Sequence, residues 1–587
     1  MRFITQVSSW LLPTARAALA LLAFALPFEL VAPLGRVGPL QLTSVELVLY
    51  VALALSAAAI AVDVLPSWRR LPWRRIATRH AGVIAFGLVL LLSALRAPLA
   101  RADAIKFALR SLGGIALYVA AANLLRAPRA ALTTAIAMSI GAVVAASLMW
   151  AELHLPGAAA ALAPFHVQSF DVFDLPRASG PFQYPNIAAM YLEAALPVVL
   201  AAGAAFDARR ARGFRIGTLV AVLGGVAIVQ ALSLTASRAA MLTALVVVAG
   251  LGLNAFWQKA HARWQAPAVL AIFALLAVTN TALGSLVGLR LKFWNDDVWY
   301  RSTITPVAAV PGDLAPAGQT SIDVDVRNSG VRPWPAAGEK HVALSYHWFD
   351  AATGALLVYD GVRTRLPDDV APGATVRLHA SVEAPPQPGH LRLHLEMVHE
   401  NTTWFGEQGD TGFDAAVLVG DHAAADAAPV VAITAPPPMQ APLERAPRRL
   451  LWRAALMAWR EHPLLGLGPD NFRRAYNRYV GLSRPDERLH ANNLYFETLA
   501  GLGLAGIAAL VLLVVGFAGA ARTAIRHHGA ASVAGLIATG AAIGLAAYLV
   551  HGFFDYFLEF TPTYALLWLL AGIVAGLAAG DTGKAIE

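Results

Sequence analysis

Apolar stretches of about 20 residues alternate with short polar segments in both outer parts of the chain, while the middle carries no such stretch. A helix of that length crosses the hydrocarbon core of a bilayer. The pattern therefore predicts a polytopic α-helical membrane protein with about twelve transmembrane helices. The expected spans cover residues 15–34, 43–65, 82–99, 104–125, 130–152, 188–206, 214–235, 239–257, 266–290, 493–520, 530–552 and 561–580.

The polar middle region organises the chain into four parts. We expect transmembrane helices 1 to 9 in residues 1–291 and a periplasmic insert in residues 292–440. Residues 441–492 are expected to form periplasmic interfacial helices, and residues 493–587 transmembrane helices 10 to 12. A soluble insert between membrane spans points to chemistry at an interface.

Within the insert, residues from about 305 to 420 read as short strands. Alternating runs such as SIDVDVRN, HVALSYHWFD and HLRLHLEMVHE are separated by turn signals, including Pro372-Gly373. This spacing is typical of an antiparallel β-sandwich. An Ala/Pro-rich linker follows the strands. The segment after it has helical apolar spacing and a break at Pro463–Pro469, which predicts an amphipathic helix, a turn and a second helix.

Basic residues gather in alternate loops, after the second, sixth, eighth and tenth expected spans. Loops rich in Arg and Lys stay in the cytoplasm, which predicts cytoplasmic termini and a periplasmic insert. The Ser237-Arg238 turn and the last turn near Asp555 then face the periplasm as well. The same rule accounts for the formal charge of +8, so we expect no nucleic-acid partner.

Composition limits the chemistry further. Hydrophobic residues make up 57% of the chain and charged residues 14%, and the mean hydropathy is +0.57, as in membrane proteins. The chain has no cysteine, which excludes disulfides, zinc–thiolate sites and cysteine nucleophiles. The expected outer loops hold no acidic cluster with metal-ligand spacing. We therefore expect neither a metal nor a cofactor.

A few charged residues fall in or near the apolar stretches. Lys106 lies near the start of the fourth expected span and can reach the interface, whereas Arg110 lies deeper. A charge at that depth faces protein or a watery cavity. Glu29, Glu46 and Glu193 are expected to pack against arginines.

Four local sequences resemble the O-antigen ligase and polymerase superfamily, and they occur in the family's order on one predicted face. They are RASGPFQYPNIAAMYLEAALP from Arg177, TASRAAM around Arg238, RRLLWRAALMAWREHPLLGLGPDNF from Arg448, and HANNLYFETLAGLGLAG from His490. The insert resembles an Ig-like module of bacterial cell-surface glycan enzymes in the phrases RNSGVRPW, LSYHWFD and TWFGEQGD. The superfamily resemblance covers most of the membrane portion.

The resemblance implies a GT-C-like fold and a metal-independent glycosyltransferase in the bacterial inner membrane. Members take a glycan from an undecaprenyl-diphosphate carrier at the periplasmic face, among membrane lipids. Ligases pass it to lipid A-core and polymerases to another carrier-linked glycan. The first expectation is an O-antigen ligase, and a polymerase or a protein O-oligosaccharyltransferase is the alternative. The alternative outside this class is a lipid-linked glycan transporter. Inverted internal repeats would indicate a transporter, and the sequence has no evident internal repeat.

Two positions depart from the family's pattern. Asn492 stands where many relatives carry a second histidine, and Gly501 stands where an acidic residue is often found. His490 is then the one imidazole of its motif. An acceptor hydroxyl must lose a proton as it attacks, so we expect His490 to be the general base. The alternative is a surface histidine at a helix start, with Asn492 or Asn493 as the N-cap.

Arginines are the expected ligands of the donor's diphosphate, because forked guanidinium groups stabilise the negative charge of the leaving group. Each also has an ordinary role: Arg238 could anchor a helix end, Arg448 and Arg449 could contact lipid headgroups, and Arg177 could pair with Asp174. Asn186 and Asn492 are further expected substrate contacts, against the alternative of helix caps. The acidic residues that border the same face receive no role, namely Asp470, Asp555 and Glu559.

Overall fold

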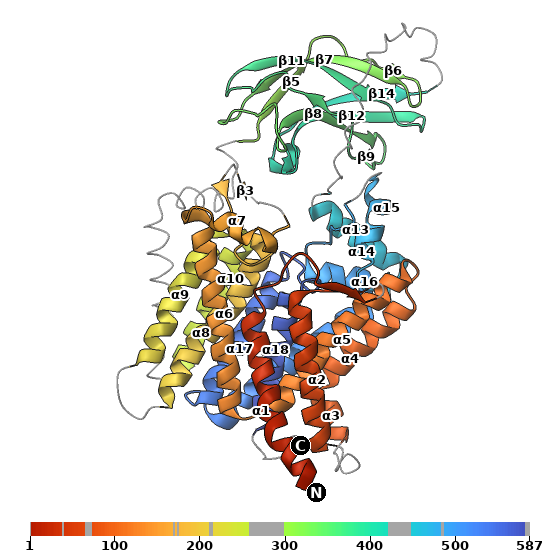
Figure 1. The fold of residues 1–587 in the computed structure, drawn as a ribbon. Coiled ribbons are helices and arrows are strands. Elements are labelled where there is room, and N and C mark those ends of the chain that lie inside the picture. Colours follow the sequence, from red (N-terminus) through yellow and green to blue (C-terminus); the bar gives the residue numbers. More distant parts are fainter. Residues whose placement is uncertain are drawn as a thin grey trace. The chain divides into compact units, whose positions relative to one another are not determined.

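The computed structural model contains a helical unit and a strand-rich unit (Figure 1). It describes residues 2–37, 40–64, 73–167, 171–172, 175–209, 215–257, 299–420, 446, 448–482 and 486–580. The helical unit comprises Met1–Leu291, Trp459–Phe472 and His490–Glu587, and the strand-rich unit comprises Lys292–Ala458 and Arg473–Leu489. The ninth expected span and the Ala/Pro-rich linker lie outside the described residues.

Helices of the helical unit follow the apolar pattern of the sequence. The long ones are α1 (Arg2–Ala25), α2 (Ser44–Val64), α4 (Ala81–Leu95), α5 (Arg101–Leu124), α6 (Pro128–His154), α8 (Pro185–Ala208), α9 (Ile216–Leu234), α10 (Arg238–Trp257), α16 (Leu494–His528), α17 (Val533–His551) and α18 (Thr561–Ala579). Short elements are α3 (Trp73–Arg79), α7 (Ala158–Leu162), and the strand pairs β1–β2 (Gly35–Val37, Leu40–Leu42) and β3–β4 (Asp171–Val172, Leu175–Pro176).

Within the described residues, eight helices are long and apolar enough to cross a membrane. A ninth is obtained if α3 and α4, which are bent by 77° at their junction, count as one span. Shorter apolar helices cover Trp10–Ala25 and Arg238–Gly252. The multi-pass helical class is confirmed, while the count of twelve stays a prediction.

The first span ends earlier than the sequence pattern predicts. Helix α1 stops at Ala25, whereas the expected span runs to residue 34. Pro27 and Pro33 follow the helix, and proline cannot continue the helical hydrogen-bond ladder. The chain then turns into the β1–β2 hairpin. Apolarity alone does not separate the helix from this extended continuation.

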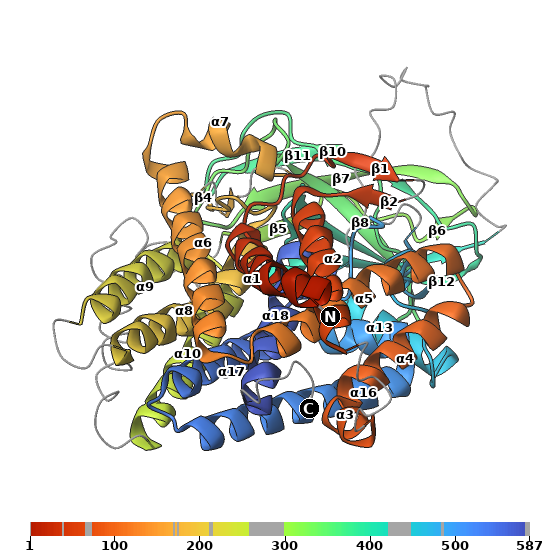
Figure 2. The same cartoon turned by 60° about the horizontal axis from the view of Figure 1, so that its bottom comes forward.

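Helices α8 and α18 are the most enclosed of the candidate spans, with 83% and 89% of their apolar windows buried. Helix α17 lies beside α8 (Figures 1 and 2), and small residues permit the close approach. A Cβ atom on Gly544 would lie 2.4 Å from the carbonyl oxygen of Ala194, and one on Gly540 would lie 2.6 Å from the Cβ of Ala201. These contacts hold the middle of α17 against α8, and the candidate site lies at one end of this packed pair.

Two sheets form the strand-rich unit. The larger has the order β10-β8-β12-β14-β6, with β9 on β8 and β13 on β12, and the smaller has the order β11-β7-β5. The strands are β5 (Ser302–Pro306), β6 (Asp313–Leu314), β7 (Gln319–Asn328), β8 (Val342–Asp350), β9 (Leu356–Val358), β10 (Thr364–Arg365), β11 (Thr375–Glu383), β12 (Gly389–His399), β13 (Thr403–Trp404) and β14 (Phe413–Val419).

Alternate residues of both sheets meet in one apolar core, as the period of two predicts. In β7, Ile322, Val324 and Val326 are buried, and Trp348 of β8 is fully buried. Strand pairing is antiparallel in every described pair except β14 with β6, which is parallel. The expected antiparallel pairing therefore holds in the strand-rich unit except at this edge. Resemblance to an Ig-like module stays a prediction.

A separate core predicts that this region folds on its own. Residues 302–420, expressed alone, should give mostly β circular dichroism and one cooperative melting transition, because their buried side chains pack among themselves. In the full chain, deletion of the region should leave the helices folded, because the two cores are separate. Loss of helical circular dichroism in the purified deletion variant would contradict this independence.

Candidate functional site

His490 lies immediately before α16, and the start of that helix is tightly fastened. The N-cap is Asn493, whose side chain accepts the N–H groups of Tyr495 and Phe496. The Asn493 side chain also donates to the Phe553 carbonyl at 2.8 Å, and Leu494 N–H donates to the Gly552 carbonyl at 2.7 Å. These bonds tie the start of α16 to the end of α17 and fix the approach of His490.

The preceding residue, Asn492, is half-buried and adopts a φ of +47°. This is the left-handed region, which asparagine tolerates better than most residues. Asn492 is therefore not the N-cap, and the structure gives it a turn conformation between His490 and Asn493. Its contact with substrate stays a prediction.

Three carboxylates surround the His490 imidazole. Its Nδ1 lies 3.0 Å from Glu497 Oε1, its Nε2 pairs with Glu559, and the same Nε2 lies 3.7 Å from Asp470 Oδ1. The His490 side chain is 7% exposed, whereas that of Glu559 is 31% exposed. The ring of Tyr556 packs on the imidazole, with 4.9 Å between centroids. Of the four groups facing His490, Glu559 is thus the most open to solvent.

This surrounding charge changes the protonation of the site. Burial lowers the pKa of His490, but the carboxylates of Glu559 and Glu497 outweigh it and hold the pKa well above its usual range. Burial and the carboxylates of Glu497, Asp470 and Glu559 likewise keep the pKa of Tyr556 well above normal. At neutral pH His490 is therefore an imidazolium, with both ring N–H groups donated to carboxylates.

Asp470 reaches His490 from the loop that follows α13 (Arg448–Glu461). Leu467 N–H donates to the Ala500 carbonyl and Gly468 N–H to the Gly501 carbonyl, both at 2.9 Å, so the loop pairs with α16. Helix α16 is kinked there, at Gly503, with a φ of +63°. A Cβ atom at this position would lie 2.5 Å from the Leu464 backbone, which explains the glycine.

The same pairing accounts for the departure at Gly501. A Cβ atom there would lie 3.3 Å from the Gly468 carbonyl oxygen, which leaves little room for the acidic side chain often found here in the family that the sequence resembles. The paired loop instead brings in the carboxylate of Asp470, whose φ of +67° lies in the left-handed region that few residues other than glycine, asparagine and aspartate adopt. Strain of this kind is typical of functional sites.

Glu559 is positioned by Arg110, a half-buried arginine. Arg110 of α5 donates to the backbone carbonyl of Glu559 and, at 2.7 Å, to Thr561 Oγ1 at the start of α18. Its Nε donates to Glu46 Oε1 at 2.8 Å. The prediction that Arg110 faces protein is thereby confirmed, as is its packing against Glu46. Glu193, in contrast, pairs with His551 at 2.8 Å.

Arg177 and Asn186 lie together in a chain of hydrogen bonds. Arg177 donates from Nε to the Thr235 carbonyl at 2.6 Å and from Nη2 to Asn186 Oδ1 at 2.8 Å. Asn186 in turn donates to Asp555 Oδ2 at 3.0 Å. Burial lowers the pKa of Arg177 to about 10, and the Asp555 carboxylate partly offsets this effect.

This chain extends toward the imidazole, because Asp555 Oδ1 accepts the N–H of Tyr556, the residue packed on His490. Asn186 is not the helix cap, since the N-cap of α8 is Tyr184. Asp174, the alternative partner of Arg177, lies outside the described residues. The structure therefore brings Arg177, Asn186 and His490 to one end of the helical unit.

Arg238 is the first residue of α10 and is exposed. The turn before it contains Ala236, which is fully buried and has a φ of +49°. Thr235, at the start of the turn, accepts the Arg177 hydrogen bond. Arg238 thus lies three residues after the Thr235 carbonyl that accepts the Arg177 hydrogen bond, and the strained turn joins the two.

Arg448 and Arg449 begin α13 and are exposed. The helix is amphipathic as predicted, with Leu451, Ala454, Ala455 and Ala458 buried. Two short helical turns, α14 (Phe472–Ala475) and α15 (Asn477–Val480), take the place of the expected second helix. Both arginines belong to the strand-rich unit and His490 to the helical unit, so their role at the site stays a prediction.

Sequence reasoning missed Glu497 and gave no role to Asp470, Asp555 or Glu559. The signal for Glu497 was local: it lies seven residues after His490, and its Oε2 accepts the Ala491 N–H at 2.8 Å. The other three come from separate turns that only the tertiary structure brings together. Within the described residues, no group of three His, Asp or Glu side chains has the geometry of a metal site.

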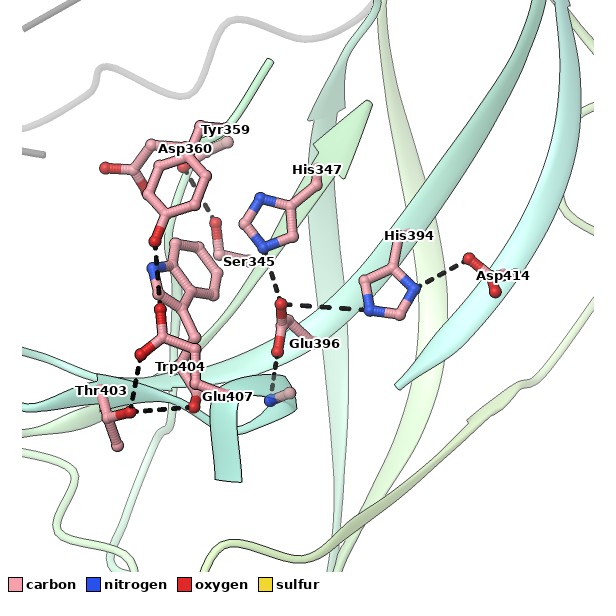
Figure 3. A network of polar contacts seen from close by, with 12 residues as sticks. Ser345, His347, Tyr359, Asp360, His394, Glu396, Thr403, Trp404, Glu407 and Asp414 are labelled. Carbon is pink, nitrogen blue, oxygen red and sulfur yellow. Dashed lines mark hydrogen bonds and ion pairs between the residues drawn. The ribbon is translucent and has the colours of Figure 1, made fainter. Parts of the chain in front are cut away.

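A second polar cluster lies in the strand-rich unit, on the face of the larger sheet opposite the core (Figure 3). His347 Nε2 contacts Glu396 Oε1 at 2.7 Å, and Glu396 accepts the Gly406 N–H at 2.6 Å. The Trp404 ring lies 4.3 Å from that of His347. The cluster joins two phrases of the Ig-like resemblance, LSYHWFD and TWFGEQGD. It fastens the β13 segment onto the sheet, and we interpret it as structural.

Comparison with known proteins gives one family match. A family model described as O-antigen ligase matches residues 409–511. The matched segment contains Arg448, Arg449, Asp470, His490 and Glu497. No curated protein matches the chain.

Proposed function

We infer from this match that the chain belongs to the O-antigen ligase/polymerase superfamily, and we propose that it is an O-antigen ligase of the bacterial inner membrane. In this proposal it moves a glycan from an undecaprenyl-diphosphate carrier to lipid A-core at the periplasmic face. Polymerases and protein O-oligosaccharyltransferases use the same kind of donor and remain the alternatives. The observation that carries the proposal is His490, buried among carboxylates at the end of a membrane helix bundle.

A small apolar cavity lies beside the cluster. The cavity is narrow, about 50 Å³, and its polar end is formed by Asp470 and Glu497. From there it continues among apolar side chains of α4, α16 and α18, including Phe86, Leu513 and Trp568. Apolar side chains thus pack directly beside these carboxylates, which keeps the His490 cluster away from bulk water.

His490 has the position of the proton acceptor. In the proposed step the acceptor oxygen bonds to the sugar C1, the C1–O bond to the diphosphate breaks, and the diphosphate leaves with the electron pair. The acceptor proton passes to Nε2 of His490, which must first be neutral and released from Glu559. The transfer rate should therefore fall at acid pH, and the raised pKa of His490 sets the pH at which it falls.

The charge around His490 indicates that the acceptor and the diphosphate of the donor bind in different parts of the site. Three carboxylates face one imidazolium, so a diphosphate placed there would meet net negative charge. We therefore propose that Asp470 and Glu559 hold hydroxyl groups of the acceptor sugar. The diphosphate then binds on the arginine side, with Arg238 and one of Arg448 and Arg449 as ligands. Arg177 and Asn186 orient that side through their hydrogen bonds.

Arginine ligands in place of a metal predict that chelators leave transfer intact. Purified protein treated with EDTA should retain most of its transfer rate, since a guanidinium group cannot be removed by a chelator. The comparison is the same protein with added magnesium or manganese. Loss of transfer in EDTA that either metal restores would reject the metal-independent mechanism.

The proposed orientation predicts on which side of the membrane two positions of the chain lie. A reporter enzyme that is active only in the periplasm should be active when fused after Gly420, at the end of β14, and inactive when fused after Gly529, between α16 and α17. The inverse pattern would place the His490 cluster on the cytoplasmic side and reject the proposed donor.

Direct reconstitution tests the function. Purified protein is incubated with carrier-linked glycan and, separately, with lipid A-core, a second carrier-linked glycan, or an acceptor peptide. A product whose mass equals the acceptor plus the glycan identifies the reaction. Product on lipid A-core supports the ligase, and product on either other acceptor alone replaces it with the corresponding alternative. Absence of every product from folded protein would reject glycosyl transfer.

A further inference from the structure

Helix α3 forms a basic rim at the end of the helical unit remote from His490. Its sequence is WRRIATR, and it is bent by 77° from α4, so it runs across the end of the bundle (Figure 2). None of its residues is buried, and Trp73 is 55% exposed. An exposed helix with arginines and a tryptophan at the end of a span is typical of a membrane interface.

A cavity of about 510 Å³ opens beneath this rim. That volume is in the range of small-molecule and lipid sites. Among the described residues of the lining, none is acidic. The lining residues are Arg75, Thr78, Arg79, His80, Gly82, Val83, Tyr118, Leu513, Gly516, Phe517, Gly519, Ala520, Thr523, Ala575 and Ala578.

The wall changes from cationic to apolar with depth. Arg75 and Arg79 are exposed at the mouth, and His80 Nδ1 lies 2.7 Å from the Tyr118 hydroxyl below them. The lower wall is made by apolar and small side chains of α4, α16 and α18. Cβ atoms built on Gly516 and Gly519 of α16 would meet no atom within 4 Å, so both glycines border open space.

The cavity is distinct from the His490 cluster. Helix α16 begins at Leu494, next to His490, and Gly516 and Gly519 lie more than 20 residues further along it. At 1.5 Å per residue this is roughly 35 Å, about the thickness of the hydrocarbon core. The cavity and the cluster therefore belong to opposite ends of the membrane-spanning helices.

We propose that this cavity binds one anionic phospholipid from the leaflet opposite the His490 cluster. Its phosphate pairs with the guanidinium groups of Arg75 and Arg79, and one acyl chain follows the apolar wall toward Phe517. Charge complementarity at the mouth and the apolar wall below together select a lipid over a soluble anion. The inference does not depend on the proposed reaction.

The ordinary role of these arginines is to orient the protein, and that role makes a different prediction. Orientation depends on the number of basic residues near a span, whichever direction their side chains take. A built lipid site depends on position. Arg74 lies on the same helix and is exposed, but it does not line the cavity. Neutralising Arg74 thus changes the charge count without touching the proposed site.

The test compares lipid binding by variants of equal charge. Full-length protein is titrated with phosphatidylglycerol in detergent and the bound lipid is counted by native mass spectrometry. Arg75→Gln with Arg79→Gln should weaken binding roughly ten- to thirty-fold, at about a tenfold factor or less for each arginine. The control is Arg74→Gln with Arg129→Gln; Arg129 is exposed in the first turn of α6 and does not line the cavity. This double variant should bind like the unaltered protein. Equal loss in both double variants would overturn the proposal.

A second variant tests the apolar wall without changing charge. Gly516→Leu should fill the open space and weaken phosphatidylglycerol binding, while Val515→Leu, on the same helix but outside the cavity lining, should not. Inorganic phosphate should fail to compete with the lipid, and phosphatidylcholine should bind more weakly. Unchanged binding by Gly516→Leu, displacement by inorganic phosphate, or tighter binding of a polyprenyl phosphate would each overturn the assignment to a phospholipid.

Discussion

His490→Ala should lose about 10²–10⁴-fold in turnover while the protein remains folded, the usual range for removal of a positioned general base. The fold should survive because the start of α16 is held by Asn493 and Leu494 rather than by the imidazole. Affinity for the carrier-linked donor should change little, since arginines are the proposed ligands of the diphosphate. The measurement is single-turnover transfer together with donor binding.

A matched histidine at the other end of α16 provides the control. His527 is exposed and lies far along the helix from His490, so His527→Ala should transfer at the normal rate. Near-normal transfer by folded His490→Ala would contradict the proposal. It would return His490 to the role of a buried ion-pair partner.

The pH dependence distinguishes a base from a structural ion pair. If neutral His490 is the active form, the rate falls as pH decreases through the pKa of the imidazole. Because Glu559 and Glu497 hold that pKa well above its usual value, the acid limb should lie above about pH 6.5, the ordinary histidine value. His490→Ala should lose this limb along with most of the rate.

Glu559→Gln tests the origin of the shift. An amide keeps the shape of the side chain but removes the negative charge next to Nε2, so the pKa of His490 should fall. The acid limb should then move to lower pH. A structural role for Glu559 would lower the rate at every pH and leave the limb in place. Movement of the limb to higher pH would contradict the assignment of His490 as the titrating group.

The helical part of the fold was predictable because a single physical requirement, length in hydrocarbon, dominates it. Ends of spans were less predictable. The first span was expected to reach residue 34, but Pro27 ends the helical geometry well before the apolar stretch is complete. The pairing at the edge of the larger sheet could not be predicted either, because the parallel contact of β14 with β6 joins segments about 100 residues apart.

The candidate site was predictable in its imidazole and not in its carboxylates. His490 belongs to a short motif, so its chemistry can be read from neighbouring residues. Asp470 and Glu559 come from two turns that have no apolar period and no pairing signal in the sequence. Their approach to His490 depends on glycine packing against α16 and on the clamp from Arg110. Such contacts are properties of the tertiary fold.

Arg238 should be required for both donor binding and turnover. Its replacement by alanine should reduce turnover by about 10²–10³-fold, the usual cost of removing one donor that stabilises developing negative charge. The KM for the carrier-linked glycan should also rise, since the same guanidinium holds the diphosphate before reaction. Arg238→Lys should recover only part of the loss, because an ammonium group lacks the planar fork.

Arg215 offers the matched control, because it is exposed at the beginning of α9, at the opposite end of that helix from the Thr235 turn. Arg215→Ala removes the same charge and should leave KM and turnover unchanged. The two variants of Arg238 also separate its roles: a helix anchor needs only a cation, so Arg238→Lys would then be fully active. Full activity of the lysine variant, or normal donor affinity in Arg238→Ala, would exclude Arg238 from the diphosphate site. It would leave Arg448 and Arg449 as the ligands to test.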